Sequence, residues 1–357
     1  MLRAKITFVV ILVILVFSFR EKFSSTPYPF PKLVYFPKMP VSESNPVTVE
    51  GVALGRYLFY DPILSLDRTI SCASCHRQEV AFSDAGQEFS SGIDGNAMKR
   101  NTLPLFNLAW YPALFWDGRA SNIENQVFQP VRAHDEMNLQ WTDAVNRIVK
   151  SKFYRAKFSA AFPGQAIDSI LIAKAIAQFE RVLISNRSKY DKVLQREASF
   201  TKEEYSGFVL MNDMTKGDCL HCHTTDADAL GTSLTFSNNG LDSIFNPSLY
   251  KDLGRGAITG NVRDNGKFKI PSLRNIALTA PYMHDGRFKT LDEVLDFYSE
   301  GVNHSVNIDS KMGMVHQKGV KLSKEEKQNI IAFLMTLSDS AFIKDPAFGN
   351  PFLKINY

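Results

Sequence analysis

Apolar residues that recur at helical spacing dominate the pattern along the chain. The longest such segment runs from Ile167 to about Val193, and in it Ile170, Ala173, Ile176 and Ala177 would share one helix face. Two shorter segments, 51–60 and 141–150, are also predicted to be helices. Signals for strands are weak. The chain is therefore predicted to be mostly α.

Three more helices are predicted from their first turns. A Ser or Thr followed three positions later by Glu, ahead of an apolar run, is a capping box. It occurs at Thr201 with Glu204, at Thr290 with Glu293, and at Ser323 with Glu326. The last box opens a helix whose buried face would hold Ile330, Phe333, Leu334 and Leu337. Residues 231–269 are rich in Asn, Gly and Asp and are predicted to be a long loop.

Residues 1–24 have the layout of an export signal. Basic residues precede an apolar run, Ile6 to Phe19, which is short for a membrane span. No A-x-A-like cleavage site follows, so a cleaved signal peptide and an uncleaved membrane anchor both stay open. In either case the rest of the chain is expected in the periplasm. Residues 25–47 are rich in Ser, Pro and aromatic residues, and we expect an irregular leader there.

Composition and charge favour a globular protein that does not bind nucleic acid. The chain has 357 residues, of which 45% are hydrophobic and 22% charged, so it has ample length to bury a core. Of its net charge of +4, the basic side chains of residues 1–24, less one glutamate, contribute +3. The remainder is near neutral, so nothing in its charge suggests a nucleic-acid binder.

All four cysteines fall in C-x-x-C-H motifs. Two thiols at this spacing can add to the two vinyl groups of one porphyrin, and the next histidine then reaches the iron. No cysteine is left over for a disulfide or a zinc site. Two covalent c-type haems are predicted, with His76 and His223 as proximal ligands. The two attachment motifs are Cys72-Ala-Ser-Cys75-His76 and Cys219-Leu-His-Cys222-His223.

An internal repeat supports two haem domains. The segment 105–119 aligns without a gap on the segment 273–287, with six identities in 15 positions. The identities include the tripeptide Asp-Gly-Arg, and Trp116 is the counterpart of His284. We expect two cytochrome c-like domains related by duplication, with long loops. They would span residues 48–200 and 201–340, followed by a tail at 341–357.

The same alignment bears on the sixth ligand of each haem. Tyr298 follows His284 at the same separation along the chain as Pro130 follows Trp116, so Tyr298 and Pro130 are counterparts. A tyrosine oxygen can ligate haem iron, whereas proline cannot. The second domain is therefore expected to fill its distal position with Tyr298, while the first leaves it open to a substrate. Met312 and Met314 are alternative ligands in the second domain, and Met98 is the residue that would close the first.

The motifs resemble those of a known family. The segment FWDGR with Gln126 and Glu136 after it, and the segment PSLRNIALTAPYMHDGR, are similar to bacterial dihaem cytochrome c peroxidases and the related methylamine-utilisation dihaem enzyme. The resemblance covers roughly residues 48–340. It implies that the N-terminal haem reduces hydrogen peroxide and that the C-terminal haem takes electrons from a small cytochrome or copper protein. The family often forms dimers, so a homodimer is one option here.

The resemblance also assigns roles to single residues. It places Trp116 between the haems as an electron relay, and Gln126 and Glu136 in the distal pocket, where Pro130 matches a distal proline. Cleavage of the peroxide O–O bond needs a proton moved from the inner to the outer oxygen, and Glu136 is the candidate general base and acid. Gln126 would orient the peroxide. Three positions match residues that hold a calcium ion between the domains: Asn101, Thr279 and Pro281.

Two departures from the family pattern keep the function open. Many of these peroxidases carry a distal histidine that leaves only after reduction, but Gly92 and Ile93 stand near that position, so activity without prior reduction is expected. The peroxidases have methionine where this chain has Tyr298, whereas the methylamine-utilisation enzyme has tyrosine. Peroxide reduction is the leading function. The alternatives are a dihaem oxidase that modifies a partner protein through a high-valent iron state, and a non-catalytic electron carrier, against which the open site and Glu136 speak.

Overall fold

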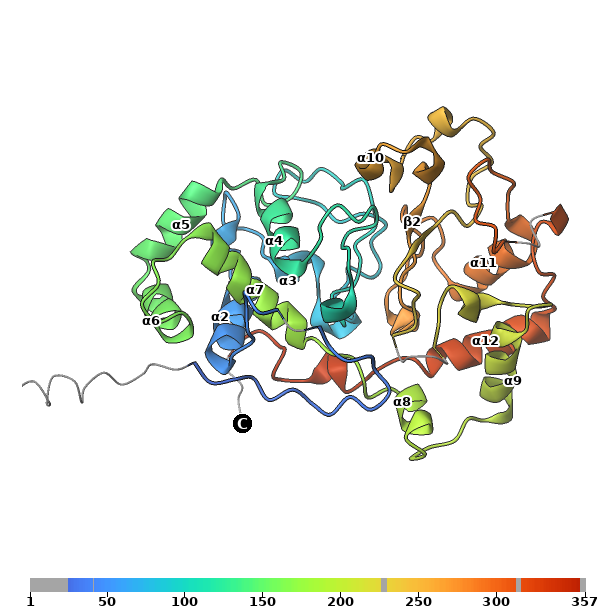
Figure 1. The fold of residues 1–357 in the computed structure, drawn as a ribbon, viewed down its shortest axis with the longest axis horizontal. Helices are drawn as coiled ribbons and strands as arrows, with labels where there is room; N and C mark the ends of the chain where they lie inside the picture. Colours follow the sequence, from blue (N-terminus) through green and yellow to red (C-terminus); the bar gives the residue numbers. More distant parts are fainter. Residues whose placement is uncertain (1–24, 41, 226–229, 313–315, 354–357) are drawn as a thin grey trace, which may run out of the picture.

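The chain folds into two helical lobes that lie side by side (Figure 1). The computed structural model describes residues 25–40, 42–225, 230–312 and 316–353. The predicted signal or anchor at residues 1–24 and the candidate ligand Met314 lie outside these ranges. Among the residues so described, no helix has the length and apolar character needed to cross a membrane.

The first lobe is built around the crossing of two helices, α2 and α7. The helix predicted at 51–60 is confirmed as α2, which begins where the Thr48 hydroxyl accepts a hydrogen bond from the Gly51 amide. The helix predicted at 141–150 is confirmed as α5. The helices of this lobe are α2 Val49–Tyr60, α3 Cys72–Cys75, α4 Ile123–Arg132, α5 Trp141–Lys150, α6 Lys152–Ala161 and α7 Ser169–Val182.

The prediction of one continuous helix from Ile167 to about Val193 is wrong. The structure has two helices there, α7 and α8 (Lys189–Leu194), with a non-helical segment between them. In that segment the Ser185 amide donates to the Asn107 side chain, and the amides of Asn186 and Arg187 donate to the carboxylate of Asp339. These long-range hydrogen bonds replace the helical ones, so a continuous apolar pattern did not mean a continuous helix.

The second lobe contains the three helices predicted from capping boxes, and all three boxes are confirmed. The predicted face is buried: Ile330 and Phe333 of α12 are fully shielded from solvent, and so is Leu337, which lies just after the helix ends at Met335. The helices of this lobe are α8, α9 Lys202–Asn212, α10 Gly256–Thr259, α11 Leu291–Asp296, which continues as a π-helical turn over Phe297–Gly301, and α12 Lys324–Met335.

Little of the described chain is sheet. Strands β1 (Phe236–Ser237) and β2 (Phe268–Lys269) pair antiparallel, with Phe236 opposite Lys269. The predicted loop over 231–269 is therefore confirmed for most of its length and is interrupted by these strands and by α10. Short 3-10 helices occupy Pro62–Leu64, Gln78–Val80, Leu108–Trp110, Cys219–His221, Pro247–Leu249, Val262–Asp264, Ile276–Leu278 and Phe342–Lys344.

The two lobes share one kind of helix crossing. In the first lobe a Cβ on Gly55 of α2 would lie 1.9 Å from the Ala175 carbonyl oxygen of α7. In the second, a Cβ on Gly207 of α9 would lie 1.9 Å from the Asn329 carbonyl oxygen of α12. Only glycine permits such an approach. The two crossings therefore match in register, with Ala175 equivalent to Asn329.

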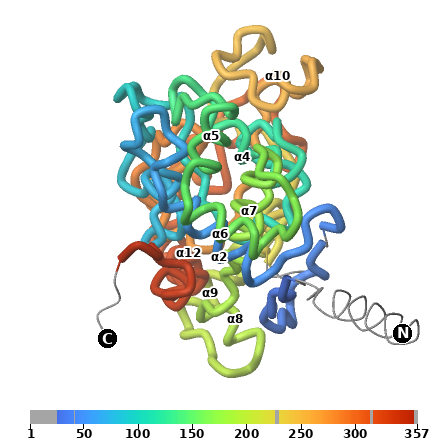
Figure 2. The backbone as a smooth tube through the Cα atoms, turned by 90° about the vertical axis from the view of Figure 1, so that its left-hand side faces the viewer, coloured from blue at the N-terminus to red at the C-terminus, as the bar shows by residue number. Residues whose placement is uncertain are grey.

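The two ends of the described chain each pack across the lobes. The leader places Phe36 5.3 Å from the Trp110 ring of the first lobe, and the Arg274 guanidinium of the second lobe lies 4.9 Å from the Phe36 ring. The tail returns to the first lobe, where Phe342 and Phe348 enter a buried cluster. Figure 2 shows the leader (dark blue) and the tail (red) on opposite sides of the molecule. Both ends thus hold the lobes together.

Candidate active site

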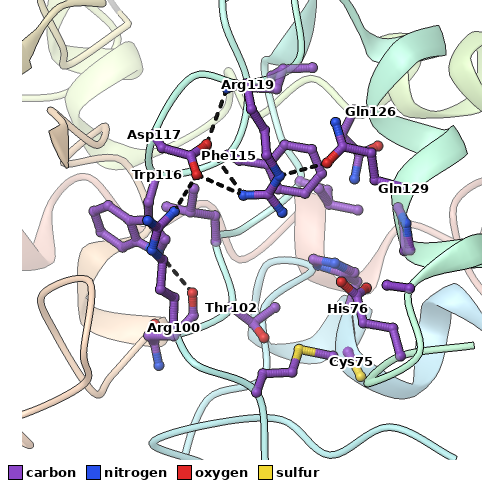
Figure 3. A pocket seen from close by; sticks show the side chains of 18 of the residues that line it. Cys75, His76, Arg100, Thr102, Phe115, Trp116, Asp117, Arg119, Gln126 and Gln129 are labelled. Atoms are coloured by element: carbon purple, nitrogen blue, oxygen red, sulfur yellow. Dashed lines mark hydrogen bonds and ion pairs between the residues drawn. The ribbon is translucent and has the colours of Figure 1, made fainter. Parts of the chain in front are cut away.

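A cavity of about 740 Å³ opens beside the first C-x-x-C-H motif. Its walls come from that motif, from the turn at 115–119, from α4 and from the turn at 133–137 (Figure 3). All of the residues predicted for the first site line it. They are Cys72, Cys75, His76, Trp116, Gln126, Pro130 and Glu136. Met98, the residue that would close the site, lines it as well.

The two proximal histidines are oriented in the same way. Nδ1 of His76 lies 2.9 Å from the Phe82 carbonyl oxygen, and Nδ1 of His223 lies 2.9 Å from the Pro271 carbonyl oxygen. Each imidazole therefore donates through Nδ1, which leaves Nε2 as the atom free to bind iron. Burial lowers the pKa of both histidines to about 4, which favours the neutral ligand form. None of the four cysteines forms a disulfide. These residues fit a covalent haem in each lobe.

Helix α4 presents a polar face to the first cavity. Ile123, Val127 and Val131 are the buried apolar residues of this helix. Gln126, Gln129 and Pro130, at positions that share a helix face, line the cavity, as do Val127 and Val131. Within the described structure, Oε1 of Gln126 is buried and has no hydrogen-bond partner. A buried amide oxygen without a partner is costly, so this atom fits a site that receives a polar guest.

Glu136 lies in the turn that follows α4, and Gly92 and Ile93 pack against the backbone of this turn. Its carbonyl oxygen accepts a hydrogen bond from the Ile93 amide at 3.0 Å, and a Cβ on Gly92 would lie 2.2 Å from the Asp135 carbonyl oxygen. Burial and the neighbouring Asp135 raise the pKa of Glu136 to about 7, whereas Arg119 lowers it. A carboxyl group with this pKa exchanges protons near neutral pH, as a general acid and base must.

Sequence reasoning did not single out Arg119, although it stands in the repeated Asp-Gly-Arg tripeptide. Its Nε donates to Gln129 at 2.6 Å, its Nη1 donates to Asp117 at 3.1 Å, and its guanidinium lies 3.5 Å from the centre of the Phe115 ring. Figure 3 shows the guanidinium between Asp117 and Gln129. These contacts hold the positive charge of Arg119 in the cavity that Glu136 also lines, where it lowers the pKa of Glu136.

Two other buried charged residues were also missed. Lys269 lines both cavities, its Nζ lies 3.9 Å from the centre of the Tyr111 ring, and burial lowers its pKa to about 7. Glu180 on α7 lines the first cavity. Neither residue lies in a motif, and on sequence each resembles a surface charge.

The second cavity is smaller, about 360 Å³, and adjoins the second C-x-x-C-H motif. Tyr298 lines it from the π-helical turn after α11, and its hydroxyl accepts a hydrogen bond from the Asn239 side chain at 3.1 Å. Burial raises the pKa of Tyr298 to about 12. Met312 lines the same cavity, as does Met283, which sequence reasoning did not consider. The structure therefore brings both Tyr298 and Met312 to the second site.

Trp116 and His284 meet where the lobes join. Their ring centroids are 6.5 Å apart, and Trp116 lines both cavities. The backbone of Asn101 bridges them, because its carbonyl oxygen accepts from the Trp116 indole and its amide donates to the His284 carbonyl oxygen, each at 2.8 Å. The two residues that the repeat makes counterparts thus face each other.

The turns that carry these rings have the same backbone geometry. Asn107 and Asn275 have φ of +54° and +56°, and Gly118 and Gly286 have φ of +72° and +67°. A β-bridge closes each turn, between Leu114 and Ala120 in the first lobe and between Tyr282 and Phe288 in the second. The repeat seen in the sequence is therefore also a repeat of conformation.

The three candidate calcium residues lie together near this junction. Asn101, Thr279 and Pro281 all line the second cavity. The Asn101 side-chain nitrogen donates to the Glu88 carbonyl oxygen at 3.1 Å, which leaves its Oδ1 for another partner. Nowhere in the described ranges do three or more His, Cys, Asp or Glu side chains gather to hold a metal ion. A calcium ion here would depend on amide and carbonyl oxygens.

Comparison with known proteins identifies the family. The family model described as di-haem cytochrome c peroxidase matches residues 49–199. The chain is 34% identical to methylamine utilization protein MauG of Methylophilus methylotrophus, over 85% of this chain and 87% of the relative. The chain belongs to the dihaem cytochrome c peroxidase family. Membership confirms the resemblance and implies two c-type haems.

Members with different names are about equally similar. Cytochrome c peroxidase Ccp of Escherichia coli K12 is 33% identical, over 85% of this chain and 61% of the relative. Among solved structures, a MauG-like protein associated with microbial copper homeostasis is 35% identical, with a TM-score of 0.84, and the match covers 91% of this chain and 100% of that protein. The family is thus established, and it contains both peroxidases and MauG proteins.

Proposed function

We propose that this chain is an exported dihaem cytochrome c peroxidase that reduces hydrogen peroxide to water in the first cavity, with electrons entering through the second. The observation that carries the proposal is the polar side of the first cavity. Glu136, with a pKa of about 7, and the unpartnered oxygen of Gln126 stand there beside His76. Tyr298 lies in the other cavity.

The chain's own residues supply binding and proton transfer. The haem held by Cys72, Cys75 and His76 supplies the iron at which peroxide is reduced. Glu136 in its carboxylate form accepts the proton of the inner peroxide oxygen and returns it to the outer oxygen, which then departs as water. Gln126 accepts a hydrogen bond from the peroxide through Oε1 and fixes its orientation. Arg119 lowers the pKa of Glu136 and so keeps part of its population ionised near neutral pH.

Electrons pass between the sites through Trp116 in this proposal. The indole lines both cavities and is hydrogen-bonded to the Asn101 backbone, so its position is fixed. Tyr298 is the proposed sixth ligand of the second haem, with Met312 as the alternative. A calcium ion bound through Asn101, Thr279 and Pro281 would hold the junction rigid. The two proposed domains arose by duplication, which the matching turns and helix crossings support. They were expected at 48–200 and 201–340, but α8 packs in the second lobe although it precedes residue 200.

The proposed setting is the periplasm, as the N-terminal signal or anchor predicts. The electron donor is a small cytochrome c or copper protein, and the oligomeric state is a monomer or a homodimer. These assignments rest on the sequence pattern and on the family.

A second candidate function is oxidation of a side chain in a partner protein. The position of Tyr298 in the second cavity favours it, because tyrosine at this position resembles the methylamine-utilisation enzyme. The similarity to MauG and to the MauG-like protein associated with copper homeostasis is consistent with this candidate. It would use the same first cavity and draw electrons from the partner protein.

Steady-state turnover with hydrogen peroxide and reduced cytochrome c, without pre-reduction of the enzyme, tests the proposal. Oxidation of two cytochrome c molecules per peroxide is expected from the protein as isolated. Turnover only after reduction would contradict the open first site. Consumption of peroxide without oxidation of the carrier would favour the second candidate.

A further inference from the structure

Glu180 is a buried acid in the wall of the first cavity that the proposed mechanism does not use. Its side chain belongs to α7 and the residue is 3% exposed. Among the described residues, its Oε2 has no hydrogen-bond partner. The adjacent Arg181 is engaged elsewhere, because it makes two hydrogen bonds of 2.7 Å to Glu124. Glu180 therefore stands at the cavity with a carboxyl oxygen that no neighbour satisfies.

The second lobe shows what stands at the same place in the other cavity. The glycine crossings align Ala175 with Asn329, and the same register along the two helices aligns Glu180 with Leu334. Ile176 and Glu180 line the first cavity, and their equivalents Ile330 and Leu334 line the second. One wall position thus carries a carboxyl group in the first cavity and a leucine in the second.

A carboxyl group at this wall position lowers the stability of the fold unless it has a hydrogen-bond partner. A buried acid without a hydrogen bond destabilises the fold, whereas a leucine would fill the position at no such cost. Burial raises the pKa of Glu180 to about 8, while Arg181 acts to lower it and Glu124 to raise it. At neutral pH the group is a neutral acid with a proton to donate. Glu180 and Cys72 line the same cavity, and the charge of Glu180 raises the pKa of the free Cys72 thiol more than the charge of Glu136 does.

We propose that Glu180 is a positioning residue that donates a hydrogen bond at the Cys72 edge of the first haem and sets the reduction potential of that haem alone. When Glu180 ionises, its negative charge stabilises the oxidised iron, so the potential of the first haem falls as pH rises. The second haem, beside Leu334, lacks this response. The inference rests on the proposed difference between the two sites, but its test uses no peroxide, so the two can fail separately.

Spectroelectrochemical titration of the haem-containing protein from about pH 6 to about pH 10 tests the inference. The parent protein should show a fall in the first potential with two components, one near pH 7 from Glu136 and one near pH 8 from Glu180. Glu180→Gln, which keeps the shape, and Glu180→Leu, which copies the second lobe, should both lose the component near pH 8 and leave the second potential unchanged. The control Glu136→Gln should lose the component near pH 7 and keep the one near pH 8.

Two results would overturn the inference. One is a Glu180→Gln protein whose first potential follows that of the parent at every pH. The other is an equal shift of both potentials, which would mean a general structural effect. If Glu180→Leu does not retain two haems, the isosteric Glu180→Gln still decides the question.

Discussion

Trp116 and His284 face each other across the junction of the lobes, with ring planes at 71° and centroids 6.5 Å apart. They occupy matching turns of the internal repeat, and Asn101 is hydrogen-bonded to both. His284 also stacks on Phe268 of β2 at 3.7 Å. The wall of one cavity is therefore continuous with the wall of the other, and a short aromatic contact joins them.

Replacing Glu136 by Gln should lower kcat for peroxide by about 10²–10⁴-fold, because the amide cannot carry a proton between the peroxide oxygens. Both haems should be retained, since the Glu136 backbone, not its side chain, makes the contact with Ile93. Stopped-flow assays and a haem count per chain measure the two effects. Glu203→Gln, at an exposed carboxylate of α9, serves as the control. Near-normal turnover would remove Glu136 from the mechanism.

The pH profile should report the same carboxyl group. Because the pKa of Glu136 is raised to about 7, the base is protonated and inactive below that pH, and kcat/KM should rise as pH increases through about 7. Asp135→Asn should move this limb to lower pH, since Asp135 raises the pKa. Arg119→Gln should move it to higher pH, while Arg119→Lys keeps the charge and should change it little. Shifts in the same direction for Asp135→Asn and Arg119→Gln would contradict the assignment.

Replacing Tyr298 by Phe should alter the second haem only. The variant loses the proposed oxygen ligand, so the low-spin EPR signal of the ferric protein should shift or give way to a second high-spin signal, while the high-spin signal of the first haem stays. Met312→Leu should leave both signals as they are. If Met312→Leu changes the low-spin signal and Tyr298→Phe does not, methionine is the ligand.

Adding a methyl group at either crossing glycine, Gly55 or Gly207, should destabilise the fold. Gly55→Ala and Gly207→Ala each place a Cβ 1.9 Å from a backbone carbonyl oxygen, which cannot move without separating the helices. Each variant should be destabilised by about 1–3 kcal/mol. Thermal unfolding of the haem-containing protein measures this. Val209→Ala, at an exposed position of α9, is the control, and an unchanged Tm in both glycine variants would contradict the close packing.

The helix starts that depend only on neighbouring residues could be predicted from the sequence. The capping boxes at Thr201, Thr290 and Ser323 lie in local sequence and form as predicted, because a cap needs only its own first turn. The break after Val182 was not predictable, since it depends on hydrogen bonds to Asn107 and Asp339 from distant parts of the chain.

The site residues also divide into those that the sequence could predict and those that only the packing reveals. The C-x-x-C-H motifs and the repeat located His76, Trp116 and Tyr298, and the structure brings each of them to a cavity. Glu180 was beyond sequence reasoning, because a glutamate in a helix usually faces solvent and only the packing of α2 and α4 on α7 shows that it is buried.

EPR of the ferric protein as isolated tests the central claim most directly, namely that the first cavity is open and the second is closed by a side chain. The account predicts one high-spin haem and one low-spin haem, and an added exogenous ligand should change only the high-spin signal. Two low-spin haems in the protein as isolated would contradict it.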